Sequence, residues 1–471
     1  MEVENGSRMA DRWRWSRQQV FTMVAMSSVN FSSMICYSIL APFFPSEARR
    51  KGVSQTIIGL IFGWYALCVL LVSLLLGKYI VQIGAKFMII SGIFVSAVCT
   101  MLFGLLDRTS SGMPFILLCF LVRSVNAVGF AAAVTSSFAI LAKVFPNNIA
   151  TVMGCVEVFT GLGLILGPPL GGWLYQSFGF EIPFIALGCL LFAMVPFNIC
   201  LLPKLDADES ESSFLRLCSC VRILLICFAL FTLSSGLGFL DATLALFAVD
   251  KFSMSSGSVG LLMMGLSLPY GAASPVFGFF SDKFPHLRRW MMVTGGMITA
   301  MGFCLLGPVP VLHVTSHLWL TVLMLVLIGF SLCLTGIPSF AEMLVSAHEL
   351  GLPENLSTLG LVSGLFSAVW SAGYVPYSIL LILLRRIESV YPCLCCRMFF
   401  GPVVGGYVAQ QVNFQSASGV QGGITFIAAL LLGVFYIYEE FQKKRSLQCK
   451  GNGSPADPDA TTPLLNSTNP S

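Results

Sequence analysis

The sequence predicts an all-α polytopic membrane protein with about twelve transmembrane helices in two six-helix bundles. The first observation is composition: of the 471 residues, 56% are hydrophobic and 10% are charged, a balance that soluble globular chains do not show. The second is that apolar stretches of the roughly 20 residues needed to cross a bilayer core recur along nearly the whole chain. The third is a pair of short motifs found once in each half, which indicates an internal repeat.

Six spans are predicted in the first bundle, over residues 20–202, after a cytoplasmic tail of residues 1–19. Each span is an apolar stretch between short polar segments. They lie near Val20–Phe44, Thr56–Leu76, Phe87–Leu106, Phe115–Leu141, Met153–Tyr175 and Pro183–Leu202. Residues 203–222, PKLDADESESSFLRLCSCVR, are the longest polar interruption and are predicted to form a central cytoplasmic loop.

The second bundle is predicted over residues 223–440, followed by a disordered cytoplasmic tail over residues 441–471. Its spans lie near Ile223–Val249, Val259–Phe280, Trp290–Gly307, Leu318–Val345, Thr358–Phe400 and Gly422–Tyr438. The eleventh is irregular, because residues 374–398 contain Pro376 and Pro392, which oppose one continuous helix, together with Arg385, Arg386 and Glu388. We interpret this segment as an atypical insertion that interrupts the span.

Basic residues are distributed unequally between alternate loops, and this bias sets the orientation of the chain. One set of loops and tails includes Arg12, Arg14, Arg17, Lys86, Lys143, Arg222, Arg288, Arg289, Lys443, Lys444 and Arg445. The other set has Arg49, Arg50, Lys51, Arg108 and Lys251. Because the more basic loops stay in the cytoplasm, both termini and the central loop are predicted to be cytoplasmic.

A GPxxGG motif occurs in both halves, as GLGLILGPPLGG in the fifth span and FFGPVVGG in the eleventh. Small residues four positions apart leave one helix face without side chains, so that a neighbouring backbone can approach closely. We predict a helix-packing role for Gly163, Gly167, Pro168, Gly171 and Gly172, and for Gly401, Pro402, Gly405 and Gly406. Ordinary packing explains a single glycine, whereas the twin copy indicates a repeated element.

A loop motif is also repeated, after the second and after the eighth span. GFFSDKFPHLRR provides Asp282, Lys283, Arg288 and Arg289, whereas GKYIVQIGAKF has Val81 where the acid would be. The acid and the bases can bridge to neighbouring helix ends, and we predict that they hold the cytoplasmic face closed until the bundles move. The bias of cytoplasmic loops toward basic residues explains the arginines, but it does not explain the acid.

Ionisable residues inside a membrane are costly and are therefore candidates for function. Asp241 lies in the middle of the seventh span, Glu157 one turn before the glycines of the fifth, and Glu342 in the tenth. We predict that these acids bind substrate or protons, because a carboxylate in a low-dielectric site can alternate between protonated and ionised forms. The alternatives are a structural hydrogen bond for Asp241, a pair with Arg123 for Glu157, and a wetted position near the cytoplasmic mouth for Glu342.

Arg123 in the fourth span, with Asn126 one turn away, is predicted to be a coupling or conformational residue, since it would repel a cationic substrate. Aromatic rings can form walls for organic cations, although at helical spacing they more often pack or anchor at the membrane interface. The available rings are those of Tyr37, Tyr65, Trp370 and Tyr374.

Together these motifs resemble the proton-coupled antiporters of the major facilitator superfamily. LVRSVNAVGFAAA resembles the family's buried-arginine motif, GLGLILGPPLGG its antiporter motif and GFFSDKFPHLRR its loop motif. GPPLGGWLYQSFGFEIPFI and FLDATLALF resemble the vesicular amine transporters in particular. MICYSILAPFFP, LVRSVNAV, AKVFPNN and NLSTLGLVSGLFSA are similar to the polyamine-carrying members of that family.

The resemblance implies the major facilitator fold and a proton-coupled antiporter that moves organic cations, namely polyamines such as spermine and spermidine, into acidic secretory or synaptic vesicles by alternating access. It implies an acid at Asp241, whereas the family's acids in spans one and eleven are replaced here by Asn30, Ser32, Ser33 and Ser367. The alternatives are a multidrug or organic cation–proton antiporter of the same superfamily, and a transport-impaired isoform with a non-transport role.

The expected partners are a small organic cation, protons and the lipid bilayer, and transport depends on a proton gradient made by another protein. No enzymatic activity, cofactor, metal or nucleic acid is expected; CLCC at residues 393–396 lacks the second ligand pair of a zinc site. The tail DPDATTPLL resembles a dileucine sorting signal, which makes Leu464 and Leu465 candidates for binding sorting adaptors.

Overall fold

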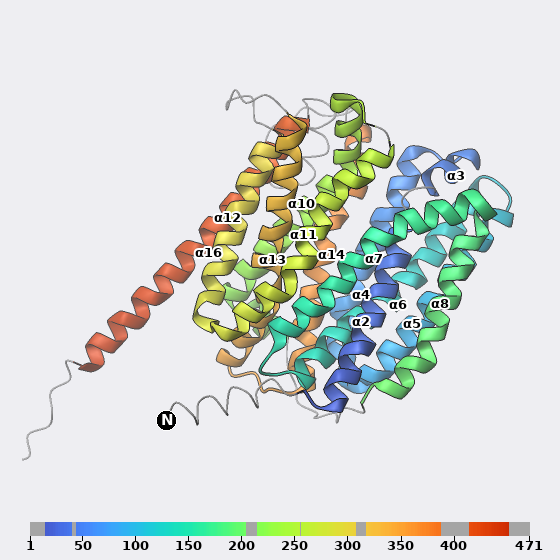
Figure 1. Cartoon of the computed structure of the whole chain (residues 1–471). Helices are drawn as coiled ribbons and strands as arrows, with labels where there is room; N and C mark the ends of the chain where they lie inside the picture. Colours follow the sequence, from blue (N-terminus) through green and yellow to red (C-terminus); the bar gives the residue numbers. More distant parts are fainter. Residues whose placement is uncertain are drawn as a thin grey trace, which may run out of the picture.

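The computed structural model describes residues 15–39, 44–203, 214–254, 256–307, 317–387 and 414–451. Within these residues every regular element is a helix, and twelve helices are long and apolar enough to cross a membrane. The predicted all-α class and the twelve spans are thereby confirmed. Figure 1 shows the long helices running side by side, with the last one extending past the ends of its neighbours.

The first half contains six long helices joined by short connections. They are α2 (Arg17–Ser38), α4 (Gln55–Ile83), α5 (Ala85–Leu105), α6 (Met113–Val144), α7 (Ile149–Phe178) and α8 (Glu181–Leu201), with short α3 (Phe44–Arg50) and η1 (Leu106–Arg108) between them. Local chemistry sets several ends. Ser16 and Gln19 form a capping box at the start of α2, and Gly84, with a φ of 89°, lets the chain turn between α4 and α5.

The second half repeats this arrangement. Its long helices are α10 (Val221–Phe252), α11 (Ser256–Lys283), α12 (Arg288–Leu306), α13 (Leu318–Glu349), α14 (Leu356–Ile387) and α16 (Phe414–Gly451), with short α9 (Phe214–Cys218) and η2 (Pro285–Leu287). We call the end of the molecule where α7, α10 and α12 begin the basic end. It is the end that the distribution of Lys and Arg predicts to be cytoplasmic.

The eleventh span differs from the sequence-based expectation. α14 continues through Pro376 to Ile387, so the interruption predicted at Tyr374 does not occur in this backbone. Proline removes one backbone N–H, which membrane helices tolerate where neighbouring groups satisfy the freed carbonyl. The rest of the predicted insertion lies outside the described residues, as does the second glycine motif, that is Gly401, Pro402, Gly405 and Gly406.

The hydrophobic core shows where the two bundles meet. One continuous cluster near the basic end contains side chains of both bundles. At its centre Phe138 of α6, Phe340 of α13 and Phe366 of α14 form a triad with ring centroids 5.4 to 5.7 Å apart. Two other clusters are confined to one bundle each, within residues 35–187 and within residues 233–417. The bundles therefore share a core toward the basic end and have separate cores toward the other end.

Two helix pairs bring the bundles into backbone contact at the basic end. α4 crosses α14 so closely that a Cβ on Gly77 would lie 2.6 Å from the carbonyl oxygen of Gly360. α7 meets α11 in the same way, because a Cβ on Gly154 would overlap the carbonyl oxygen of Ser274. The Ser274 hydroxyl donates a hydrogen bond of 2.9 Å to the Gly154 carbonyl. Only glycine fits at these crossings, so the closure depends on the absence of side chains.

The glycine motif of the fifth span packs α7 against α2 inside the first bundle. A Cβ on Gly163 would lie 2.8 Å from the carbonyl oxygen of Phe31, and the Ser38 hydroxyl donates to the Gly163 carbonyl at 3.2 Å. Gly167 lies against Ser38 as well. Gly172 differs, because a Cβ there would meet nothing within 4 Å. The motif therefore contributes its first two glycines to this helix contact.

Candidate functional site

Asp241 lies in the middle of α10, and its side chain is exposed. Its electrostatic neighbours are Tyr37 of α2 and Tyr374 of α14. Since α2 belongs to the first bundle and α14 to the second, the carboxylate faces the boundary between the bundles. Among the described residues no hydrogen bond or ion pair holds it. A structural hydrogen bond, the alternative considered for this acid, is therefore not seen, and the carboxylate is available to a ligand.

Glu157 forms a hydrogen bond between the two bundles. It lies on α7, half-buried, and its Oε2 accepts from the hydroxyl of Tyr270 on α11 at 3.1 Å. This bond is one turn from the crossing of Gly154 and Ser274, and the contact between α7 and α11 continues past it to Gly161 and Gly271. Sequence analysis did not identify Tyr270 as a site residue. A tyrosine directly after Pro269 in a membrane helix is the signal that could have identified it.

Tyrosines connect the two acids. Tyr374 interacts electrostatically with Asp241 on one side and with Tyr270 on the other, and Tyr270 holds Glu157. The arrangement therefore places one carboxylate from each bundle beside aromatic rings that come from both. Such a site can hold a proton on either acid, or ammonium groups against carboxylate and ring faces.

Arg123 is buried in the first bundle, with 5% of its surface exposed. Its guanidinium lies over the ring of Tyr65, 4.2 Å from the centroid, and 5.8 Å from that of Phe62. The expected alternative, an ion pair between Arg123 and Glu157, is not found among the described residues. Asn126, one turn away, is half-buried.

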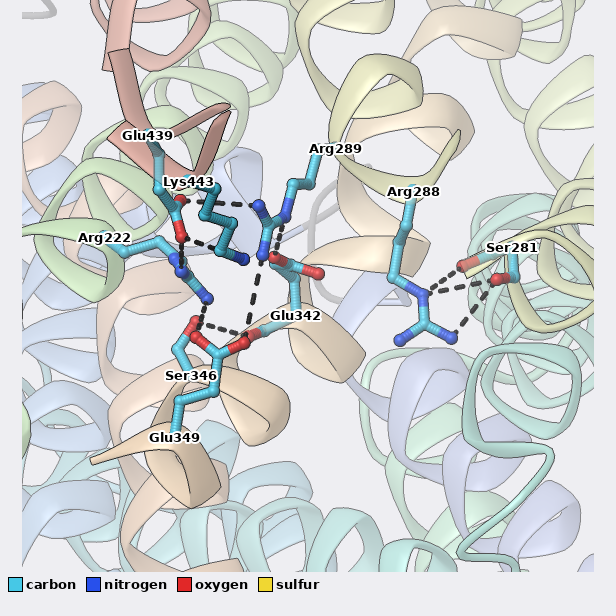
Figure 2. A network of polar contacts seen from close by, with 9 residues as sticks. All are labelled: Arg222, Ser281, Arg288, Arg289, Glu342, Ser346, Glu349, Glu439 and Lys443. Carbon is cyan, nitrogen blue, oxygen red and sulfur yellow. Dashed lines mark hydrogen bonds and ion pairs between the residues drawn. The ribbon is translucent and has the colours of Figure 1, made fainter. Parts of the chain in front are cut away.

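Glu342 lies in a network of charged side chains at the basic end of the second bundle, which Figure 2 shows. It is 3% exposed, and Arg289 donates to it at 2.9 Å. Arg289 also reaches Glu439 of α16 at 3.4 Å. Arg222 at the start of α10 bonds Glu439 and Glu349, and with Arg289 of α12 the network connects four helices. Glu342 is thus neither a wetted acid nor a neighbour of Asp241, and sequence reasoning missed Arg222 and Glu439 as its network partners.

Asp282 connects the bundles at the basic end. Its carboxylate accepts from the backbone N–H of Ala150 at 3.3 Å, and from the N–H and hydroxyl of Thr151 at 2.7 and 2.8 Å. α7 begins at Ile149 without a side-chain cap of its own, so an acid of the second bundle satisfies its first turn and faces the positive end of its dipole. Arg288 donates to Asp282 at 3.3 Å and to Ser281, as Figure 2 shows for Ser281.

We expect Asp282→Asn to slow the transport that the sequence resemblance implies, by weakening this contact. Caps and N-terminal charges contribute about 1–2 kcal/mol, so the population closed at the basic end should fall roughly 5- to 30-fold relative to the open one. Uptake rates in proteoliposomes at matched protein content would measure the effect. Asp107→Asn is the control, because Asp107 pairs with Lys51 inside one bundle. Equal losses in the two variants would contradict a role of Asp282 between bundles.

The remaining predicted residues have simpler surroundings. Lys283 is exposed, with its ammonium group 5.5 Å from the centroid of the Phe279 ring. Trp370 packs near Phe366 of the aromatic triad, with centroids 6.4 Å apart. No group of metal-ligating side chains occurs in the part of the chain that the structure describes. Leu464 and Leu465 lie outside the described residues.

Comparison with known proteins agrees with this architecture. The model of the Major Facilitator Superfamily matches residues 26–376. The chain is 52% identical over 431 residues to the MFS-type transporter SLC18B1 of Homo sapiens, covering 92% of this chain and 89% of that protein. It is 27% identical over 261 residues to the chromaffin granule amine transporter of Rattus norvegicus, covering 54% and 48% respectively.

A solved structure has the same fold. The crystal structure of the human organic anion transporter MFSD10 (TETRAN) superposes with a TM-score of 0.68 at 16% identity, covering 88% of this chain and 99% of that one. At this identity the likeness concerns the arrangement of helices alone.

Proposed function

Because this chain belongs to the major facilitator superfamily and is a membrane transporter of that kind, we propose that it exchanges protons for polyamines across a vesicle membrane by alternating access. The observation that carries the proposal is the pair of acids on opposite bundles. Among the described residues Asp241 is exposed and has no hydrogen bond or ion pair, and Glu157 accepts a hydrogen bond from Tyr270 of the other bundle. A ligand that bridges the two acids would contact both halves of the protein at once, as alternating access requires.

The arrangement of charge supports polyamines as the substrate class. Polyamines carry ammonium groups separated by methylene runs, and the site offers separated carboxylates with Tyr270 and Tyr374 between them. Aromatic faces favour both the cations and the apolar runs. The name of one relative, a chromaffin granule amine transporter, supports an amine substrate.

The state of the molecule supports alternating access. The bundles share a core and backbone contacts at the basic end, whereas their cores are separate at the other end. We assign the basic end to the cytoplasm from the distribution of Lys and Arg. The structure then corresponds to the state in which the acids face the vesicle lumen, where substrate is released and protons are taken up.

Proton coupling arises because a proton and an ammonium group cannot occupy the same carboxylate at once. Each acid holds either a proton or an ammonium group, because both compete for the same carboxylate. In an acidic lumen protonation of Asp241 and Glu157 displaces the polyamine, and in the cytoplasm loss of the proton restores the anionic site. The proton gradient is supplied by a separate pump, and we place the protein in secretory or synaptic vesicle membranes. Leu464 and Leu465 remain the proposed contact for sorting adaptors.

The test is uptake by the purified full chain in proteoliposomes with an acidic interior. We expect labelled spermidine to accumulate, spermine to compete, and a proton ionophore to abolish accumulation. Lack of gradient-dependent uptake would contradict proton-coupled polyamine transport and favour a non-transport role. Equal competition by bulky monovalent cations would favour the multidrug antiporter instead, because such cations need only one carboxylate.

A pair of variants separates the two roles of Glu157. Glu157→Gln removes the charge but keeps an acceptor for Tyr270, whereas Tyr270→Phe keeps the charge and removes the hydrogen bond. Since hydrogen bonds to charged groups contribute about 1.5–3 kcal/mol, we expect Glu157→Gln to raise the KM for spermidine at least tenfold. We expect Tyr270→Phe mainly to change the maximal rate. A larger KM effect in Tyr270→Phe would show that Glu157 acts only as a contact between the bundles.

A further inference from the structure

We propose that Arg123 binds a small monovalent anion, chloride in the cell, inside the first bundle. The proposal does not require the substrate to be a polyamine; only its consequence for cation affinity rests on the proposed function. The observation behind it is that two buried donors of the Arg123 guanidinium have no partner among the described residues. Arg123 is 5% exposed, and its Nε and Nη2 are buried without a hydrogen-bond partner among the described residues.

The aromatic rings around Arg123 do not satisfy these groups. The guanidinium carbon lies 4.2 Å from the centroid of the Tyr65 ring, so the ring covers one face of the planar group. Guanidinium N–H bonds point outward in the plane, away from a ring that covers the face. A buried donor without an acceptor is unfavourable, and a buried charge without a countercharge is more so. Among the described residues the surroundings of Arg123 therefore hold the cation but provide no acceptor for these two donors.

The acids of the first bundle are engaged elsewhere. Each of the four within residues 15–203 has another partner: Glu47 bonds Tyr175 and Arg50, Asp107 pairs with Lys51, Glu157 accepts from Tyr270, and Glu181 pairs with Arg108. Among the described residues Asp241 of the second bundle is linked to Arg123 only through Tyr37, which interacts with both. Tyr37 packs on Tyr65, with centroids 6.3 Å apart. Within the part of the chain that the structure describes, the charge of Arg123 thus has no paired countercharge behind this tyrosine pair.

The unneutralised charge and the two unsatisfied N–H donors of Arg123 define the ligand. One guanidinium calls for one negative charge, and two adjacent N–H donors at the edge of a nearly covered group suit a small acceptor. A halide meets both conditions, whereas a sugar acid such as gluconate is too large to reach a side chain that is 95% covered. A bound anion also cancels the repulsion between Arg123 and a cationic substrate at Asp241, so chloride should strengthen substrate binding.

Thermal stability provides the test that does not depend on transport. The purified full chain is compared in chloride, bromide and gluconate at equal ionic strength. We expect both halides to raise Tm saturably, by about 3 °C at saturation. Arg123→Gln should lose the shift and Arg123→Lys, which keeps the charge but not the planar donors, should need a higher halide concentration. Arg108→Gln is the control, since Arg108 is exposed and paired with Glu181.

Transport provides the second readout. In proteoliposomes the KM for spermidine should be about tenfold lower in chloride than in gluconate, and Arg123→Lys should reduce that difference. Equal Tm and equal KM in the two salts would overturn the proposal, as would a halide shift that persists in Arg123→Gln. A halide shift that appears only in Asp241→Asn would show that Asp241 itself is the counterion. If spermidine is not transported but the halide shift depends on Arg123, the anion site stands and the proposed function fails.

Discussion

Asp241→Asn is expected to abolish proton-driven polyamine uptake while leaving expression and folding unchanged. The asparagine fills nearly the same volume but can neither carry a charge nor exchange a proton. Hydrogen bonds to charged groups contribute about 1.5–3 kcal/mol, so apparent affinity for the cation should fall roughly 10- to 150-fold. Coupling to protons should be lost as well. Folding should be unaffected, because among the described residues no hydrogen bond or ion pair holds this carboxylate in place.

The measurement is labelled spermidine uptake into acidified proteoliposomes, normalised to reconstituted protein. Asp250→Asn is a matched control, because Asp250 lies on the same helix and is exposed near its far end. Asp241→Glu keeps the charge and should retain part of the activity. Uptake by Asp241→Asn within a factor of two of the parent would remove Asp241 from the site and leave Glu157 as the remaining candidate between the bundles.

Gly154→Leu is expected to stop transport by preventing closure at the basic end. Even a Cβ at this position would overlap the carbonyl oxygen of Ser274, and helix backbones cannot yield as a flexible side chain would. Overpacking costs about 1–3 kcal/mol, comparable with the few kcal/mol that separate conformational states. The state closed at the basic end should therefore lose population to a state in which α7 and α11 are apart at this end.

Thiol labelling can report the change of state. Cys333 of α13 is fully buried in an apolar cluster that includes Ala150 of α7, so separation of the bundles should expose it to a water-soluble maleimide. The labelled residue is identified by peptide mapping. Gly172→Leu is the control, because a Cβ on Gly172 would meet nothing within 4 Å on the same helix. Normal transport by Gly154→Leu would show that this crossing opens without constraint.

The sequence was informative wherever a property belongs to one segment. Span length depends on hydropathy within about 20 residues, so twelve helices could be predicted and were found. The bare face of α7 also follows from its own spacing, because glycines four residues apart must share one face. Asp241 could be singled out because an acid in an apolar run is conspicuous whatever surrounds it. α14 was the exception, since proline chemistry opposed a helix that the structure continues through Pro376.

Partnerships between segments could not be read from the chain. Glu342 and Glu157 have the same sequence signature, an acid within a span, yet Arg289 binds the first and Tyr270 the second. Their partners are 53 and 113 residues away along the chain, and no local pattern specifies which faces of distant helices meet. Arg123 shows the same limit, because its sequence signature does not reveal that the described acids of its own bundle pair with other groups. The sequence by itself determined which groups enter the membrane, since that depends on the composition of each segment. Only the tertiary structure decided which charges are neutralised, because neutralisation depends on the few ångströms between helices that packing sets.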